Sequence, residues 1–158
     1  MRVSGDRVAL WIVLSILTVW SATLILVYWK MIAPDPLLSA SQNCDVATAR
    51  SLLDEGASIN TMDSWSSTPM MYAAANGCTS IVKLLLEKGD DVNAPSRVAR
   101  TPLLWAAHGG HSETVKFLID RGARITSRDQ DGKTALMLAT EEGHEETANL
   151  LKAAGAVE

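Results

Sequence analysis

A repeat of about 33 residues is the feature that most limits what this chain can fold into. Pro36, Pro69, Pro102 and Ala135 mark equivalent positions in its four copies, and glycine follows the last three of them at one fixed distance, at positions 77, 110 and 143. A second glycine column closes all four copies, at positions 56, 89, 122 and 155. A period of this length predicts a solenoid, because one such unit cannot bury its apolar face alone and must stack on the next.

Each copy has the pattern of two short helices. Thr68, Thr101 and Thr134 place a hydroxyl at a helix N-terminus, and proline or alanine follows where a helix accepts it. Residues 103–107 predict a first helix, and the second begins at Ser112, with apolar residues at spacings of three and four. The repeats are therefore expected at about 36–66, 67–99, 100–132 and 133–158.

These residues resemble the ankyrin repeat family. The resemblance rests on RTPLLWAAHGGHSETVKFLIDRGA, on KTALMLATEEGHEETANLLKAAGA and on the turn at residues 129–134. It implies an all-α fold, an ankyrin-repeat solenoid of helix-turn-helix units with β-hairpin fingers between them. It also implies a non-enzymatic module that binds proteins through its finger tips and the concave face of its first helices. The first copy departs from the family, with Cys44 for glycine and Asp45 for histidine.

A run without any charged side chain or histidine, residues 8–29, precedes the repeats. As a helix it would span roughly 33 Å, enough for a hydrocarbon core of ~30 Å. A cleaved signal peptide is the alternative, but its apolar region is only about 7–15 residues long and a small-residue cleavage site follows it closely. The sequence therefore predicts a single transmembrane helix before the solenoid, an uncleaved signal anchor at residues 8–30, which also contacts the lipid bilayer.

The charges around this run predict its orientation. Arg2 and Arg7 lie in the flank 1–7, which is therefore expected in the cytoplasm, with the repeats periplasmic or otherwise extracytoplasmic. The linker 31–35 reaches at most ~17–18 Å, so the repeats should stay near the bilayer. Within the anchor, small or weakly polar residues on one face and a central tryptophan are candidates for packing against another membrane helix. These candidates are Ser15, Thr18, Trp20 and Ala22.

The resemblance to ankyrin repeats places candidate partner-binding residues on the fingers and at the ends of the inner helices. The candidates are Ser64, Trp65, Ser67, Asn76, Arg97, Val98, Arg100, His108, Asp131, Lys133, Glu141 and Glu142. Trp65 is the strongest of them, because a tryptophan on a finger tip has no core to fill and tryptophan is enriched at binding hot spots. The alternatives are that Trp65 packs on its own finger or dips toward lipid. Tyr72 and Trp105 are expected to serve structural packing.

The remaining reactive side chains predict no catalysis, cofactor or metal site. No phosphate-cradling glycine loop or nucleophile elbow is present in the sequence, and the three histidines lack zinc ligands at suitable spacing. Cys44 and Cys78 lie in adjacent copies of the repeat. Equivalent sites in stacked repeats are expected about 10 Å apart, beyond the ~4.4–6.8 Å that a disulfide allows between Cα atoms. A disulfide between them stays open as an alternative if the repeats lie outside the cytoplasm.

The leading hypothesis is a scaffold tethered to the membrane that binds a protein partner in or near the membrane. The alternative is an accessory or assembly subunit of an integral membrane complex, held mainly through its transmembrane helix. A third is a protective or inhibitory module that guards a secreted enzyme. A net charge of −4 excludes a polybasic nucleic-acid binder, and no small-molecule substrate is expected.

Overall fold

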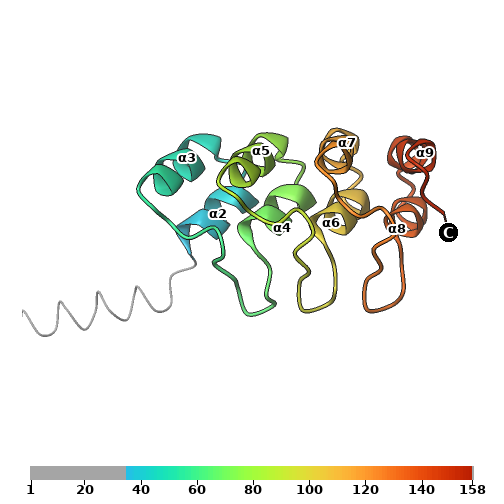
Figure 1. Ribbon diagram of the computed structural model, residues 1–158, viewed down its shortest axis with the longest axis horizontal. Coiled ribbons are helices and arrows are strands. Elements are labelled where there is room, and N and C mark those ends of the chain that lie inside the picture. The colour runs from blue at the N-terminus through green and yellow to red at the C-terminus, as the bar shows by residue number, and fades with distance from the viewer. Residues whose placement is uncertain (1–34, 158) are drawn as a thin grey trace, which may run out of the picture. The chain divides into compact units, whose positions relative to one another are not determined.

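The computed structural model describes residues 35–157. These residues lie in one compact unit, Asp35–Glu158, and form eight helices in four antiparallel pairs (Figure 1). The first helices of the pairs are α2 (Pro36–Gln42), α4 (Pro69–Ala75), α6 (Pro102–His108) and α8 (Ala135–Glu141). The second helices are α3 (Val46–Asp54), α5 (Thr79–Glu87), α7 (Ser112–Asp120) and α9 (Glu145–Ala153). This is the helical solenoid that the period of the repeat predicts.

The helices form two rows, with α2, α4, α6 and α8 in one and α3, α5, α7 and α9 in the other (Figure 1). Three loops project beyond the first row; we call them the second finger (residues 55–68), the third finger (88–101) and the fourth finger (121–134). Within residues 35–157 no helix is long and apolar enough to cross a membrane. The anchor predicted at residues 8–30, with its packing candidates Ser15, Thr18, Trp20 and Ala22, lies outside the described residues.

Side-chain caps begin three of the four first helices; Thr101 stands at the N-terminus of α6 as predicted, but its hydroxyl makes no capping hydrogen bond. The hydroxyl of Thr68 accepts a hydrogen bond from the N–H of Met71, and Thr134 caps α8 in the same way. In the first copy the carboxylate of Asp35 takes over this part, accepting from the N–H of Leu37 at 2.8 Å. Because each cap fixes where a helix begins, it also fixes where the preceding finger must end.

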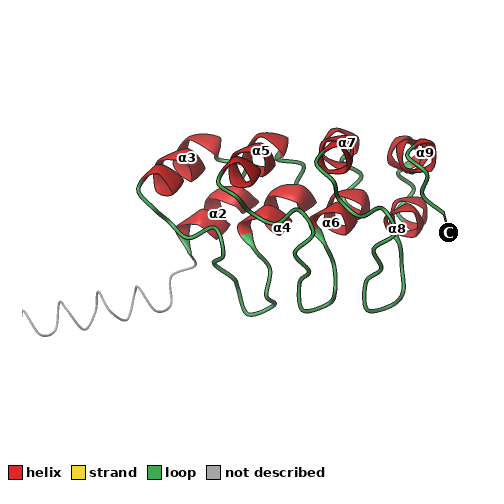
Figure 2. Cartoon of the chain, in the orientation of Figure 1, coloured by secondary structure: helices red, strands yellow, loops and turns green. Residues whose placement is uncertain are grey.

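The expected β-hairpin fingers are absent from the described residues, which contain no regular strand (Figure 2). Only an isolated antiparallel bridge joins Arg128 to Thr134 in the fourth finger. Each finger instead closes on a tight turn; in the second finger the N–H of Asp63 donates to the carbonyl of Ser67 at 3.2 Å. The next residue already caps a helix, so the strands have no length in which to grow.

The core lies between the two rows of helices. Small residues recur at one position of the first helices, where Ala73, Ala106 and Ala139 are completely buried. Leu85 and Leu118 fill the matching positions of the second helices and are equally buried. Alanine in the first helices and leucine in the second let neighbouring helix pairs approach closely. The core is therefore continuous along the stack and has no single central cluster.

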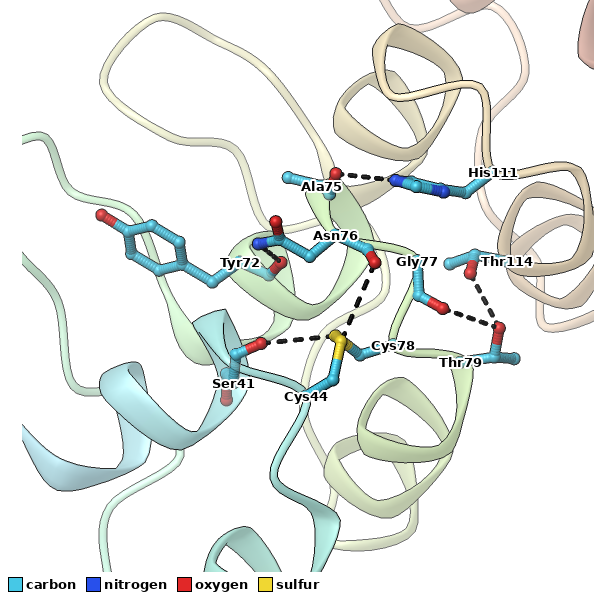
Figure 3. Close-up of a disulfide and its surroundings, with 10 residues drawn as sticks. All are labelled: Ser41, Cys44, Tyr72, Ala75, Asn76, Gly77, Cys78, Thr79, His111 and Thr114. Atoms are coloured by element: carbon cyan, nitrogen blue, oxygen red, sulfur yellow. Dashed lines mark hydrogen bonds between the residues drawn. A yellow bond between two sulfur atoms is a disulfide. The ribbon is translucent and has the colours of Figure 1, made fainter.

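One contact between neighbouring repeats joins the first helix of one pair to the histidine that precedes the second helix of the next. The ring of His111 lies over Gly77, and one of its nitrogens is 2.9 Å from the carbonyl oxygen of Ala75 (Figure 3). His144 repeats this contact over Gly110 and hydrogen-bonds the carbonyl of His108 at 3.0 Å. These two histidines are therefore structural.

At the first interface a disulfide between Cys44 and Cys78 replaces the glycine and the histidine (Figure 3). Their Cα atoms are 5.3 Å apart, so the expectation of about 10 Å was wrong. The two cysteines are not equivalent sites. Cys44 occupies the glycine position of its repeat, with a positive φ of 56°, and Cys78 occupies the histidine position of the next. Their offset by one position brings them together across the interface.

Candidate partner-binding groove

An apolar groove of about 250 Å³ lies where the second and third fingers meet the helices α4 and α6. The residues that line it are Asp63, Trp65, Ser67, Met71, Tyr72, Ala75, Ser96, Val98 and Trp105. We call this site the aromatic groove. Because it is concave and mostly apolar with a few polar groups, it has the character of a binding site.

The turn of the second finger presents Trp65 at the edge of this groove. The carboxylate of Asp63 accepts hydrogen bonds from the N–H groups of Trp65, at 2.9 Å, and Ser67, at 2.8 Å. Ser66 completes the turn with a positive φ of 58°. These bonds fix the backbone while Trp65 as a residue stays 68% exposed. A large aromatic side chain is therefore held in solvent by a rigid turn.

Tyr72 and Trp105 occupy the same position of α4 and α6, and both are half-buried on the groove wall. The hydroxyl of Tyr72 donates to the free oxygen of the Asp63 carboxylate at 2.7 Å. Burial acts to raise the pKa of Asp63, but the hydrogen bonds from Tyr72, Ser67 and Trp65 lower it overall. Asp63 is thus ionised at neutral pH and fully engaged by its own finger and helix.

The third and fourth fingers are joined by an ion pair beside the groove. Nε of Arg100 lies 3.1 Å from a carboxylate oxygen of Asp129, whose side chain is only 1% exposed. The same guanidinium lies 5.0 Å from the centre of the Trp105 ring, a cation–π contact. The N–H of Gln130 also donates to the carbonyl of Val98. These contacts hold the third finger, and the groove wall it carries, against its neighbour.

The structure gathers only some of the predicted partner-binding residues. Trp65, Ser67 and Val98 line the groove. The candidates Ser64, Asn76, Arg97 and Asp131 are exposed outside it. Two others form ion pairs inside the domain, Arg100 with Asp129 and Lys133 with Glu141, and Nδ1 of His108 lies 3.5 Å from a carboxylate oxygen of Glu142.

Sequence reasoning missed much of the groove. Asp63, Met71 and Ser96 were not anticipated, and Tyr72 and Trp105, expected to pack structurally, line it as well. The sequence did hold a signal for the groove. Tyr72 and Trp105 occupy equivalent positions of adjacent repeats, and Trp65 lies on the finger that leads into the helix of Tyr72. Among the described residues no group of histidine, cysteine or acidic side chains is arranged to hold a metal ion.

Comparison with known proteins assigns the repeat. The family described as ankyrin repeats (3 copies) matches residues 26–96 and 95–157, well over half of the chain. No curated protein matches the chain.

Proposed function

The chain belongs to the ankyrin repeat family, and we propose that it is a non-enzymatic scaffold that binds a protein partner in the aromatic groove. Ankyrin repeats are protein-interaction modules, which is the coarse part of this proposal. The finer part assigns the binding to one place, where Trp65, Tyr72 and Trp105 come together.

The observation that carries the assignment is the exposure of Trp65. A tryptophan that is 68% exposed on a turn held by two hydrogen bonds is not packing a core. Tryptophan beside a concave apolar wall is the arrangement typical of interface hot spots. Contact with a partner is therefore the interpretation that we prefer over packing on its own finger.

We propose further that the partner lies in or near a membrane. The uncharged run 8–29 and the short linker 31–35 support this, since they would hold the repeats close to a bilayer. The disulfide between Cys44 and Cys78 supports a location of the repeats in an oxidising compartment, such as the periplasm. Trapping free thiols with an alkylating agent in intact cells tests this location. Cys44 and Cys78 should stay unmodified unless a reductant is added first, and rapid modification without reductant would contradict the proposal.

Substitution of two exposed residues of the second finger tests the binding site. Trp65→Ala removes the indole from the groove, whereas Met62→Ala removes a side chain of similar exposure, 57%, that does not line it. Loss of a hot spot costs at least about 2 kcal/mol, or roughly 30-fold in affinity. After mild crosslinking in intact cells, Trp65→Ala should lose its co-purified proteins and Met62→Ala should keep them. Equal recovery from the two variants would place the binding site elsewhere.

A further inference from the structure

One of the positions at which the three fingers differ lies in the wall of the aromatic groove. Asp63, Ser96 and Asp129 occupy the same position of successive repeats and begin the turns of the second, third and fourth fingers. The backbone of the three turns is the same, with the N–H of the first residue donating to the carbonyl four residues later. Only the third finger lacks a carboxylate there.

In the second and fourth fingers the carboxylate collects three donors. Asp129 accepts from the N–H groups of Asp131 and Lys133, both at 3.0 Å, and from Nε of Arg100. Asp63 accepts from the N–H groups of Trp65 and Ser67 and from the hydroxyl of Tyr72. The same kind of carboxylate site therefore occurs twice, each time with two backbone N–H donors from the turn and one donor from a neighbouring side chain.

The third finger has the equivalent hydrogen-bond donors, although it lacks the carboxylate. The counterparts of Trp65, Ser67 and Tyr72 are the N–H groups of Val98 and Arg100 and the indole N–H of Trp105. Ser96 is 7% exposed, and its hydroxyl has no hydrogen-bond partner in the described residues. The indole nitrogen of Trp105 is likewise buried without a partner in this part of the chain. Unpaired buried donors cost about 1–3 kcal/mol each, so they favour a ligand that supplies an acceptor.

We infer that the aromatic groove binds a partner segment that carries an aspartate or glutamate next to an apolar residue. The partner's carboxylate takes the place that Asp63 and Asp129 fill in the sister fingers, and the apolar residue packs on Trp65. Arg97, exposed on the same finger, forms no ion pair within the described residues, so its charge favours an acidic segment beside the groove. Since both unpaired atoms are covered, binding includes a side-chain movement in the groove wall.

This inference rests on the proposed function, and one substitution separates the two. Ser96→Asp gives the third finger the carboxylate of its sisters. It should raise the thermal unfolding midpoint by several degrees, because the internal carboxylate satisfies the donors of the finger. It should also block an acidic partner. Ser64→Asp is the matched control, since it adds the same charge at an exposed position outside the groove.

The test uses the full chain and a phage-displayed library of random dodecapeptides. We expect peptides selected on the unsubstituted chain to be enriched several-fold in aspartate and glutamate, with binding lost at least tenfold in Ser96→Asp and kept in Ser64→Asp. Selection of peptides without acidic preference, equal binding by Ser96→Asp, a lower midpoint for that variant, or no selection at all would each overturn the inference. If binding of the selected peptides depends on Trp65 but not on their acidic residues, the proposed function stands and only the inference of an acidic partner is contradicted. If binding depends on neither, the proposed function and the inference are both contradicted.

Discussion

Cys44 is bonded to Cys78 at the place where the next interface packs His111 on Gly77. The disulfide is therefore a local replacement for the glycine–histidine contact that joins the later repeats. It ties the first repeat, which departs most from the family pattern, to the rest of the stack.

Removal of this disulfide should loosen the first repeat. Closing a loop between residues 44 and 78 contributes about 3–4 kcal/mol in the chain-entropy view, so Cys44→Ala with Cys78→Ala should lower the thermal midpoint clearly. The pair Cys44→Gly with Cys78→His rebuilds the contact of the second interface and relieves the left-handed backbone of Cys44. It should recover part of the loss. Thermal unfolding with and without a reductant provides the measurement, and a wild-type midpoint that a reductant leaves unchanged would contradict the stabilising role.

Two glycines separate the cost of backbone strain from that of a collision. Gly56 and Gly77 both have positive φ, at 91° and 70°. A Cβ on Gly56 would meet nothing within 4 Å, whereas a Cβ on Gly77 would lie 2.5 Å from Nδ1 of His111. Gly56→Ala should cost about 1 kcal/mol, and Gly77→Ala at least about 1 kcal/mol more, because His111 must leave its hydrogen bond to Ala75. Urea unfolding compares the two, and equal losses would show that the histidine contact adds nothing.

Asp90 should make stability depend on pH near neutrality. It stands where the other repeats have Ala57, Ala123 and Ala156, and burial raises its pKa from 3.8 to about 6. Because folding raises this pKa, the ionised carboxylate of Asp90 destabilises the folded state. The part of the stability that depends on Asp90 is therefore highest below pH 4 and is lost as pH rises through 6. Asp90→Ala should therefore gain about 1 kcal/mol at pH 7, after allowance for partial exposure, and nothing at pH 3.5.

Unfolding of this variant by urea at the two pH values measures the effect. Asp120→Ala, which removes an exposed acid from α7, is the control and should keep the pH dependence of the wild type. A gain by Asp90→Ala that is equal at both pH values would show that the charge of Asp90 is not the cause.

Asp129 should act in the opposite direction. Burial acts to raise its pKa, but the hydrogen bonds from Lys133, Arg100 and Asp131 lower it overall. Its contribution is thus present above pH 4 and is lost as pH falls through the depressed pKa. Asp129→Asn should cost about 2–4 kcal/mol at pH 7, because it leaves the half-buried Arg100 without its counterion, and much less at pH 2. Asp131→Asn, two residues away and exposed, should cost little at either pH.

The repeating part of the fold follows from the sequence because each column has a local cause. Thr68 and Thr134 cap helices, Gly77 takes a left-handed backbone and Ala73 is small where helices meet, so the period specifies the helix pairs. The finger conformation was missed for the same reason that makes the turn stable. All three fingers close on a turn whose first residue bonds the carbonyl four residues later, and a helix cap follows at once, so at most an isolated bridge forms.

The candidate site was harder to predict because it depends on differences between columns. Trp65 was identified by its lack of a core role, but the groove beneath it comes from Tyr72 and Trp105, which look like packing residues in sequence. Ser96 is informative only when it is compared with Asp63 and Asp129, the equivalent residues of the other two fingers. The distance between Cys44 and Cys78 was misjudged because the two cysteines were treated as equivalent positions of adjacent repeats. They are offset by one position, which brings them together across the interface.

Site-specific photo-crosslinking tests the central claim, that the partner occupies the aromatic groove. A photoreactive residue at Ser64 lies next to Trp65 on the second finger, and one at Lys116 lies exposed on α7, in the other row of helices. In intact cells, position 64 should give a defined adduct with a protein, which disappears when Trp65→Ala is added, and position 116 should give none. An adduct at position 116 that is insensitive to Trp65→Ala, with none at position 64, would contradict the account.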